Sequence, residues 1–599
     1  MFEISLTNDK KSNFLVQPQL RHGYDPFLHD IFVFTDKHVS INGLKYKNGK
    51  DDFKEDKNYL ILISGKVFHI LKYSENLMPL SAEDILRMYL LKGKGILKEL
   101  KGNFIILIYN KNNNSFFIAK DQLGLKYLYY KKEQQYFYIS SNLNDFKRIP
   151  FEYNYTAVLE KILFTYPISN ETYIKNVWTL EQGGLLEYTD SELLNEVYFG
   201  IEELFNNDNG LNSFNQKLFI ELFQKSVIQR ANVSEKNNVS LTGGFDGRTN
   251  VAVLLKNNRT FRAYSFGKNG GENTSIPKHI SEKLGLNYFP VYLDDEFEKE
   301  YIENALDCIF FSDGISNFER ANYVFALKQI AEYSSYNITG LIGGEIFGAV
   351  HLKKDYINNL YFEWIYDDKR LNIKEVLLEE AFNDCFNRDF LEKNKILEKI
   401  VENIDIRKNI VKIWKNQQFP WMYYLKDLMN LGFQRFYGTQ MHLERYYCEN
   451  LTTFYDFDII NYLFSTDYIN IYRNAFKNSP WFRKNNRKLQ SALIKNSFSK
   501  IGEIPLDRGY PPNYNLDWRK IFIPYIFYKR NKKIQNMKPD FTSPEWCNIF
   551  FKEWVNKINI KNEDIFNIYE INKRIHDYNT LKYNENFNHL LSIAIWLET

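Results

Sequence analysis

The alternation of strands and helices after residue 210 constrains the fold of this 599-residue chain most strongly. Short apolar runs typical of strands lie at 238–241, 261–266, 288–292 and 336–341. Helical spacing of apolar residues separates them, most clearly after Gly247 and around 277–284. Strands that alternate with helices indicate an α/β domain with a parallel, doubly wound sheet. From about residue 355 the chain is aromatic and is predicted to be mostly helical.

The first 150 residues have a different pattern and are predicted to be mostly β. Strand-like runs lie at 59–64, 104–109, 115–119 and 136–139. The polar turn Lys111–Asn114 predicts a hairpin, and 81–100 has the spacing of a helix, so an α+β domain is expected. The polar stretch at 206–210 is interpreted as a linker. We therefore predict two domains, at 1–200 and 211–599.

The composition is that of a soluble globular protein, with 44% hydrophobic and 25% charged residues. The 77 basic residues nearly balance the 74 acidic ones, which argues against a protein that mainly coats nucleic acid. No apolar run reaches the roughly 18 residues needed to cross a bilayer. The N-terminus lacks the pattern of a signal peptide. We expect neither a nucleic-acid partner nor membrane insertion.

The four cysteines are far apart and form no C-x-x-C pair: Cys308, Cys385, Cys448 and Cys547. A disulfide framework or a zinc site is therefore not expected, and a reducing cytoplasm fits. Each cysteine is interpreted as a small buried hydrophobic residue.

The glycine-rich segment Thr242–Arg248 is the sharpest local feature. It follows a predicted strand and precedes a helix, and its glycines allow close approach of a ligand to the backbone. Free N–H groups at the start of a helix favour an anion. Thr242 can add a hydroxyl donor, and Asp246 can hold Mg²⁺. The segment is not a Walker A loop, and a tight turn with glycines for packing is the alternative interpretation.

Five segments in order resemble a known two-domain architecture. Residues 242–247 resemble the S-G-G-x-D-S pyrophosphate loop of the N-type ATP pyrophosphatases, as used by asparagine synthetase. Residues 339–348 resemble the S-G-E-G-A-D-E-L-F-G turn of that family, and 454–456 its P-F-L-D segment, with Thr453 where Pro would stand. Residues 100–104 and 120–130 resemble the L-x-G-x-F and R-D-x-x-G-x-K-P-L-Y-Y stretches of class II glutamine amidotransferase domains.

This resemblance implies an Ntn-type, glutaminase-like α+β domain followed by a PP-loop ATP pyrophosphatase domain with a helical C-terminal region. The N-terminal part departs from active glutaminases, whose nucleophile is a Cys at position 2. Here position 2 is Phe2, and no cysteine occurs before Cys308. In the G-E-I-Y-N turn of the family, Lys66 replaces the acid and His69 replaces the Asn. We therefore expect no ammonia from glutamine.

The second half of the chain also departs from the motifs of the family it resembles. Gly247 replaces the second Ser of the loop, and Gly344 replaces the metal-binding Asp of the second turn, next to a retained Glu345. Leu341 stands in place of the first Glu of that turn. Val350, followed by His351, stands where the family often has Tyr.

The resemblance assigns roles to particular residues. It implies ATP binding by the loop, by the second strand and by the second turn, at Leu241, Thr242, Gly243, Gly244, Asp246, Gly247, Ser265 and Gly343. Asp246 and Glu345 would hold Mg²⁺, and Glu345 would act near the acyl carbon as metal ligand or base. Lys488 and Arg508 are the candidate cations for the developing charge. A solvated helix face for Lys488 and a plain turn residue for Arg508 are the alternatives.

The chemistry implied is AMP-forming amide synthesis. A substrate carboxylate attacks the α-phosphorus of ATP, and an amine then displaces AMP from the acyl-adenylate. With the glutaminase Cys lost, the chain is most similar to lasso-peptide macrolactam cyclases, which implies a peptide substrate and a partner protein that processes the precursor. One alternative is an amidotransferase that uses free or partner-supplied ammonia on a small acid or sugar carboxylate. The other is a silent homologue that binds nucleotide or a partner.

Overall fold

The computed structural model describes most of the chain. The described residues are 2–7, 29–35, 39–47, 52–133, 136–189, 192–205, 210–347, 359–366, 385–417, 420–474, 484–520, 522–523, 526–527, 546–547, 550–551, 564–577 and 585–598. Val350 and His351 lie outside them.

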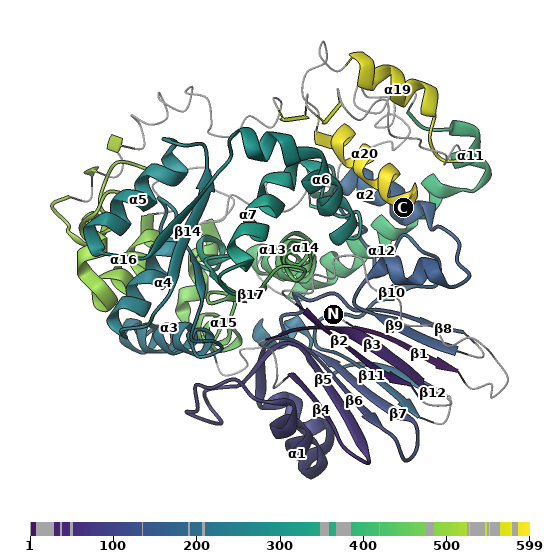
Figure 1. The fold of residues 1–599 in the computed structure, drawn as a ribbon, viewed down its shortest axis with the longest axis horizontal. Coiled ribbons are helices and arrows are strands. Elements are labelled where there is room, and N and C mark those ends of the chain that lie inside the picture. The colour runs from purple at the N-terminus through teal and green to yellow at the C-terminus, as the bar shows by residue number, and fades with distance from the viewer. Residues whose placement is uncertain are drawn as a thin grey trace.

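Two antiparallel six-stranded sheets form the N-terminal part (Figure 1). The first has the order β10 (Trp178–Thr179), β8 (Tyr129–Lys132), β9 (Tyr136–Ser140), β1 (Phe2–Thr7), β3 (Val39–Tyr46), β2 (His29–Thr35). The second has the order β12 (Glu192–Val197), β11 (Gly184–Thr189), β7 (Ser115–Lys120), β6 (Leu100–Asn110), β5 (Tyr59–His69), β4 (Phe53–Glu55). The mostly β prediction is confirmed, and β6 and β7 form the predicted hairpin.

Strand β6 shows why its sequence is a continuous apolar run. Ile105, Leu107 and Tyr109 face the core between the two sheets. Phe104, Ile106 and Ile108 face a separate core under α1 (Ala82–Lys92) and the following 3₁₀ turn at 93–98. Because both faces of the strand are buried, neither set of alternate residues needs to be polar. A capping box between Ser81 and Asp84 begins α1.

A five-stranded, fully parallel sheet lies in the second half, as predicted. Its order is β15 (Tyr288–Tyr292), β14 (Arg262–Gly267), β13 (Asn238–Ser240), β16 (Tyr336–Thr339), β17 (Glu449–Thr452). The chain leaves β13 toward β14 on one side and later returns to β16 on the other. The gap between the ends of β13 and β16 is therefore the point where the winding direction switches, which is where open α/β sheets bind ligands.

Helices surround this sheet and continue into the C-terminal region. From residue 216 to 346 the helices are α3 (Gln216–Ala231), α4 (Asp246–Lys256), α5 (Glu272–Leu284), α6 (Asp295–Phe311), α7 (Ala321–Ala331) and α8 (Gly343–Ile346), and after β17 come α15 (Phe457–Phe464) and α16 (Lys484–Phe498). The others are α2 (Tyr155–Phe164), α9 (Asn359–Ile365), α11 (Arg388–Lys393), α12 (Ile396–Gln417), α13 (Pro420–Asp427), α14 (Gln434–Glu444), α19 (Ile568–Asp577) and α20 (Glu585–Glu598), with a π-helical turn at 428–433 before α14. Helix α5 begins five residues before Pro277, earlier than predicted.

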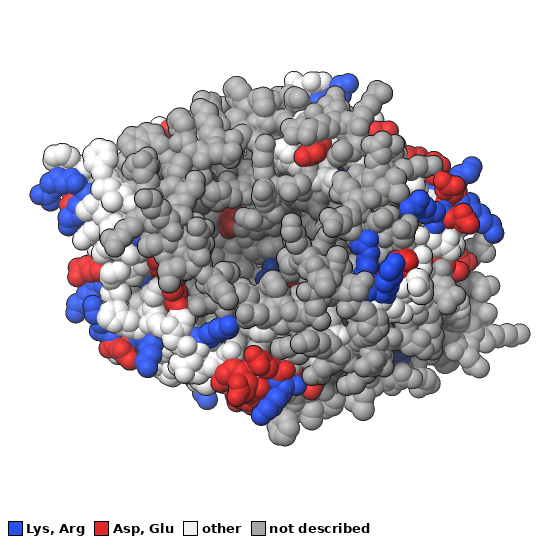
Figure 2. Space-filling model, turned by 90° about the horizontal axis from the view of Figure 1, so that it is seen from above, with Lys and Arg blue, Asp and Glu red and all other residues white. Residues whose placement is uncertain are grey.

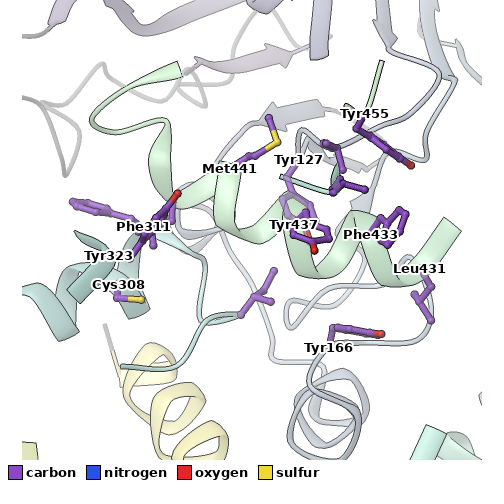
Figure 3. Close-up of a cluster of buried hydrophobic side chains, with 14 of the residues drawn as sticks. Tyr127, Tyr166, Cys308, Phe311, Tyr323, Leu431, Phe433, Tyr437, Met441 and Tyr455 are labelled. Atoms are coloured by element: carbon purple, nitrogen blue, oxygen red, sulfur yellow. The ribbon is translucent and has the colours of Figure 1, made fainter. Parts of the chain in front are cut away.

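One hydrophobic core crosses from the N-terminal part into the parallel-sheet part. Figure 3 shows Tyr127, from before β8, beside Tyr437 of α14, while Tyr323 of α7 and Phe311 of α6 approach α14 from another side. The hydroxyl of Tyr127 lies 3.1 Å from that of Thr439. Helix α14 is therefore buried between the two halves of the protein.

The C-terminal helix also joins the two halves. Lys147 Nζ donates to the carbonyl of Trp596 at 2.6 Å, and the Tyr153 hydroxyl donates to the carbonyl of Leu597 at 2.5 Å. Both bonds satisfy carbonyls in the last turn of α20, which have no partner within the helix. Among the described residues, no helix combines the length and the apolar character needed to cross a membrane.

Candidate nucleotide-binding site

The glycine-rich loop joins the end of β13 to the start of α4. Leu241 N donates to the carbonyl of Tyr264 at 2.9 Å, which extends the strand pairing into the loop. Gly244 N donates to Thr242 Oγ1 at 3.2 Å, so the Thr242 side chain shapes the turn. A Cβ atom at Gly247 would lie 2.4 Å from the carbonyl oxygen of Ser240. The helix returns so close to the strand that the Ser of the family pattern does not fit at this position.

The second glycine-rich turn lies directly on Asp246. A Cβ atom at Gly340 would lie 2.6 Å from the Cβ atom of Asp246, and one at Gly343 would lie 2.7 Å from its Oδ1 atom. Ile342 between them has a φ of 65°, a left-handed conformation that is costly for a β-branched residue. The structure therefore brings the two predicted motifs together, with Asp246 at their contact.

Burial and four neighbouring side chains set the electrostatics of Asp246. Burial, followed by the nearby charge of Glu345, raises the pKa of Asp246 to about 7. The Gln490 side-chain amide donates to Asp246 Oδ1, and this bond and the charge of Arg508 act in the opposite direction. Asp507 adds a further acid nearby. The buried carboxyl of Asp246 thus lies near two further acids, Glu345 and Asp507, and near the positive charge of Arg508.

Glu345 lies on the short helix α8 and is half-buried. The hydroxyl of Tyr472 donates to the backbone carbonyls of Glu345, at 3.3 Å, and Ile346, at 2.5 Å. These bonds fix the backbone of the turn that presents Glu345 beside Asp246. Gly344, the position of the lost family Asp, lies in the same turn.

The two carboxyl groups suit a divalent cation that is shared with phosphates. Across the described ranges, no group of three or more His, Cys, Asp or Glu side chains could enclose a metal ion. Mg²⁺ usually takes only one or two protein carboxylates and completes its shell with phosphate oxygens and water. Asp246 and Glu345 therefore fit Mg²⁺ bound together with a nucleotide, and do not form a complete metal cage.

The two predicted cations differ in their placement. Arg508 is close enough to Asp246 for its charge to lower the pKa of that carboxyl, and its Nε lies 3.8 Å from Asp507 Oδ1. Lys488 is exposed on α16, whereas Gln490, two residues further, is buried against Asp246. Side chains two positions apart on a helix point in nearly opposite directions. The structure thus places Gln490, not Lys488, at the site.

Ser265 lies on β14, where that strand extends beyond the end of β13. Strand β14 pairs with β13 only as far as Tyr264, whereas its pairing with β15 continues to Gly267. The backbone at 265–267 therefore borders the switch point. The Ser265 hydroxyl itself lies 2.7 Å from the hydroxyl of Tyr288, which donates to the carbonyl of Thr274.

Asn250, one helical turn after Asp246, connects the P-F-L-D-like segment at 453–456 to the two glycine-rich turns. Its amide donates to the carbonyl of Thr339 at 3.1 Å, and its Oδ1 accepts from Thr453 Oγ1 at 2.7 Å. The hydroxyl of Thr453, absent from the Pro of the family pattern, thus bonds to α4. Sequence reasoning did not single out Asn250, because its partners are 89 and 203 residues away.

Asp456, at the end of the P-F-L-D-like segment, pairs with the N-terminal part. Its carboxylate lies 3.0 Å from Lys101 Nζ and 2.5 Å from Arg230 Nη1, and all three groups are buried. Burial alone would raise the pKa of Asp456, but Lys101 and Arg230 lower it to about 2. Lys101 belongs to the L-x-G-x-F-like segment, so motifs from both halves of the chain meet here.

The positions that correspond to the glutaminase motifs in the N-terminal part contain ion pairs. Phe2 pairs with Gly43 of β3 at the start of β1. Lys66 Nζ lies 2.6 Å from Asp52, and its ammonium is 5.4 Å from the centre of the Tyr336 ring. Burial would lower the pKa of Lys66, but the Asp52 carboxylate raises it above its usual value.

A second lysine reaches across the boundary nearby. Lys126 Nζ lies 2.7 Å from Glu449 Oε1 on β17. A small cavity of about 40 Å³ lies between the halves here and is lined by both ion pairs. His69, at the position of the family Asn, has its pKa lowered chiefly by burial.

Figure 2 shows one face of the molecule, which is hollowed near its centre, with acidic and basic side chains visible in the depth of the hollow. Over the described part of this face the two signs of charge are interspersed. All four cysteines are buried, as predicted, and none of these four is joined in a disulfide.

Comparison with known proteins supports the two resemblances at low identity. A family model described as a glutamine amidotransferase domain matches residues 25–199. Asparagine synthetase 1 (glutamine-hydrolyzing) of Bacillus subtilis is 22% identical over 377 residues, which cover 60% of this chain and 57% of that protein. A Methanocaldococcus jannaschii protein named as an asparagine synthetase is 21% identical over 393 residues, covering 61% of this chain and 75% of its own length.

A solved structure of glutamine phosphoribosylpyrophosphate amidotransferase from B. subtilis also matches, at 15% identity. It covers 42% of this chain and 51% of its own, and its TM-score of 0.18 is too low to support an argument. The aligned region spans little more than half of the Bacillus asparagine synthetase. The chain thus has a glutamine amidotransferase-like N-terminal region and is similar, over about three-fifths of its length, to asparagine synthetases.

Proposed function

We propose that the protein is an ATP-dependent ligase that activates a carboxylate as its adenylate, releases pyrophosphate, and joins the acyl group to an amine. The observation that carries this proposal is the meeting of the two glycine-rich turns at Asp246, at the switch point of the parallel sheet. The similarity to asparagine synthetases supports the same reaction type.

In this proposal the loop at 241–247 holds the β- and γ-phosphates of ATP. Its backbone N–H groups face the anion at the start of α4, where the helix dipole also favours negative charge. Mg²⁺ held by Asp246 and Glu345 would neutralise phosphate charge when bound. Arg508 adds a positive charge near the departing pyrophosphate. Ser265–Gly267 borders the space that the nucleoside would occupy.

We further propose that the amine does not come from glutamine hydrolysed by this chain. The Cys nucleophile of the family pattern is missing, and Lys66 occupies the position of the acid in the family's G-E-I-Y-N turn. The lysines Lys101 and Lys126 extend from the N-terminal part to acids of the parallel-sheet part. The N-terminal part then serves as a scaffold that is locked to the other half by buried ion pairs.

An amine on the substrate itself is the simplest source of the amine that needs no glutamine hydrolysis. The specific form that we propose is macrolactam formation within a ribosomal peptide, in which an α-amine attacks an activated Asp or Glu side chain. The second candidate is amidation of a small acid by free ammonia, which the same missing nucleophile permits.

The experiment uses the full-length protein with ATP, Mg²⁺ and two sets of substrates. One set contains peptides with a free N-terminus and an internal Asp or Glu; the other contains small acids with ammonium chloride. We expect AMP and pyrophosphate together with a peptide that has lost one water. An amide of a small acid would instead favour the ammonia-using enzyme. ADP and phosphate, or no binding of Mg·ATP, would overturn the proposed function.

A further inference from the structure

Arg248 is a wholly buried arginine in the first turn of α4. Its Nη1 donates to the carbonyl of Ile504 at 2.6 Å, and its Nη2 donates to the carbonyl of Pro505 at 2.6 Å. Nη2 also donates to the carbonyl of Gly243, in the middle of the glycine-rich loop, at 3.2 Å. One side chain thus connects two segments that lie more than 250 residues apart in sequence.

The same two segments are joined by the backbone. Asp507 N donates to the carbonyl of Gly243 at 3.1 Å, so this oxygen accepts two hydrogen bonds. A Cβ atom at Gly243 would lie 3.0 Å from the Cβ atom of Asp507 and 3.1 Å from Ile276 Cδ1. Segment 504–508 therefore packs tightly on the outer side of the loop, and Arg508 follows directly from this contact.

The charge of Arg248 is compensated by carbonyl dipoles together with the nearby charge of the Asp507 carboxylate. Carbonyl oxygens are the only hydrogen-bond partners of its guanidinium among the described residues. Burial lowers the pKa of Arg248 to about 10, which leaves it protonated near pH 7. Since a buried charge is costly unless it is hydrogen-bonded, an arginine at this position has to be balanced by the bonds it makes.

These bonds matter for an anion-binding loop. A loop binds phosphate when its N–H groups face the anion and its carbonyls point away, because a carbonyl oxygen repels a phosphate oxygen. Both donors to Gly243 hold its carbonyl on the side of segment 504–508. They also fix the backbone from which the side chain of Arg508 extends, and the charge of Arg508 acts on Asp246.

We propose that Arg248 is a positioning residue that turns the Gly243 carbonyl away from the phosphates and, through segment 504–508, sets Arg508 beside them. This inference rests on the proposed function of the loop. It predicts that phosphate affinity and the order of segment 504–508 depend on the same guanidinium.

The test measures binding of inorganic pyrophosphate with Mg²⁺ by calorimetry, which needs no knowledge of the acyl substrate. For Arg248→Met we expect about a tenfold loss of affinity, the scale of one or two lost charge-assisted hydrogen bonds. Arg248→Lys keeps the charge but cannot span all three carbonyls, and should bind almost as poorly. For Arg248→Ala, millimolar guanidinium should restore affinity, whereas sodium chloride at equal ionic strength should not.

A second measurement reports on segment 504–508 through its cleavage by trypsin. Trypsin cleavage after Arg508 should be slowed by pyrophosphate in the wild-type protein and not in Arg248→Met. The matched control is Arg407→Met, a partly buried arginine on α12 that pairs with Asp427; it should lower thermal stability without changing pyrophosphate affinity.

The outcomes separate the two proposals. A wild-type protein that binds neither pyrophosphate nor Mg·ATP overturns the proposed function. Wild-type binding that is matched by a folded Arg248→Met, or by Arg248→Lys, overturns only the role of Arg248. If Arg248→Met and Arg248→Ala do not fold, the Lys variant and its tryptic pattern decide.

Discussion

The side-chain amide of Gln490 donates a hydrogen bond to Oδ1 of Asp246, from a helix that begins more than two hundred residues after the glycine-rich loop. The bond orients the carboxylate that we assign to Mg²⁺ and the phosphates. Gln490 itself is buried, whereas Lys488 on the same helix is exposed. Replacing Gln490 should therefore weaken nucleotide binding, whereas replacing Lys488 should change it little.

Gln490→Leu should weaken Mg·ATP binding about tenfold, because Asp246 loses a donor that fixes its geometry. Lys488→Leu, the matched change on the exposed side of α16, should alter the affinity less than twofold. Calorimetry with Mg·ATP checks both. If Lys488→Leu proves to be the damaging variant, the cation expected from the sequence acts in the site and the orientation of α16 described here is wrong.

The hydrogen bond from Thr453 to Asn250 is expected to contribute to the free energy of unfolding. Thr453→Val keeps the shape but leaves Asn250 Oδ1 buried without a donor, at a cost of about 1–3 kcal/mol. Thr453→Ser should retain most of the stability because it keeps the hydroxyl. Urea unfolding measures both variants.

Thr179→Val is the control for that experiment. The Thr179 hydroxyl is buried and has no hydrogen-bond partner in the described structure, so its removal should be neutral or stabilising. Equal losses in Thr453→Val and Thr179→Val would show that the Asn250 bond contributes nothing of its own.

The buried cluster at Asp456 predicts a pH dependence. Its pKa is lowered to about 2, so its stabilising effect is fully present above about pH 4, where the unfolded carboxyl is ionised, and is lost as the pH falls toward 2. Asp456→Asn removes the carboxylate that pairs with the buried Arg230, while Lys101 keeps Asp458 Oδ2 at 2.5 Å, and this loss costs about 3–5 kcal/mol. The difference in urea midpoint between wild type and variant should stay constant from pH 7 to 5 and shrink below pH 4. A difference that already shrinks between pH 7 and 5 would assign the effect to another group.

The N-terminal part should not hydrolyse glutamine. An enzymatic glutamate assay should detect no release above background, because the nucleophile is missing. Phe2→Cys should not restore the activity, since Lys66, paired with Asp52, still replaces the acid of the family turn. Glutamate formation by the wild-type protein would disprove the proposed loss of the ammonia supply.

Local pattern was sufficient for four of the five strands of the parallel sheet and for the glycine-rich loop. Strand β13, the loop and α4 lie within twenty residues, so their signals are contiguous in sequence. Strand β17 gave no such signal, because Glu449–Thr452 contains one apolar residue and becomes a strand by pairing with β16. Its polar side chains are held by tertiary bonds such as that between Asn450 and Thr339.

Only the part of the site that is built from residues close together in sequence could be predicted. Asp246 and its glycines follow from the motif, whereas Gln490, Asn250 and Arg248 act through partners far away in sequence. No spacing rule distinguishes Gln490 from Lys488 before the orientation of α16 is known. The domain boundary, ATP, Mg²⁺ and the peptide substrate remain predictions.

The most direct test of the account is the identity of the nucleotide products. Wild-type protein and Asp246→Asn should be incubated with Mg·ATP and the peptide and acid sets, with the exposed Asp295→Asn variant as control. The account predicts AMP and pyrophosphate from the wild type and from Asp295→Asn, reduced at least a hundredfold in Asp246→Asn, on the scale of a lost transition-state interaction. ADP and phosphate as products, or undiminished AMP formation by Asp246→Asn, would contradict it.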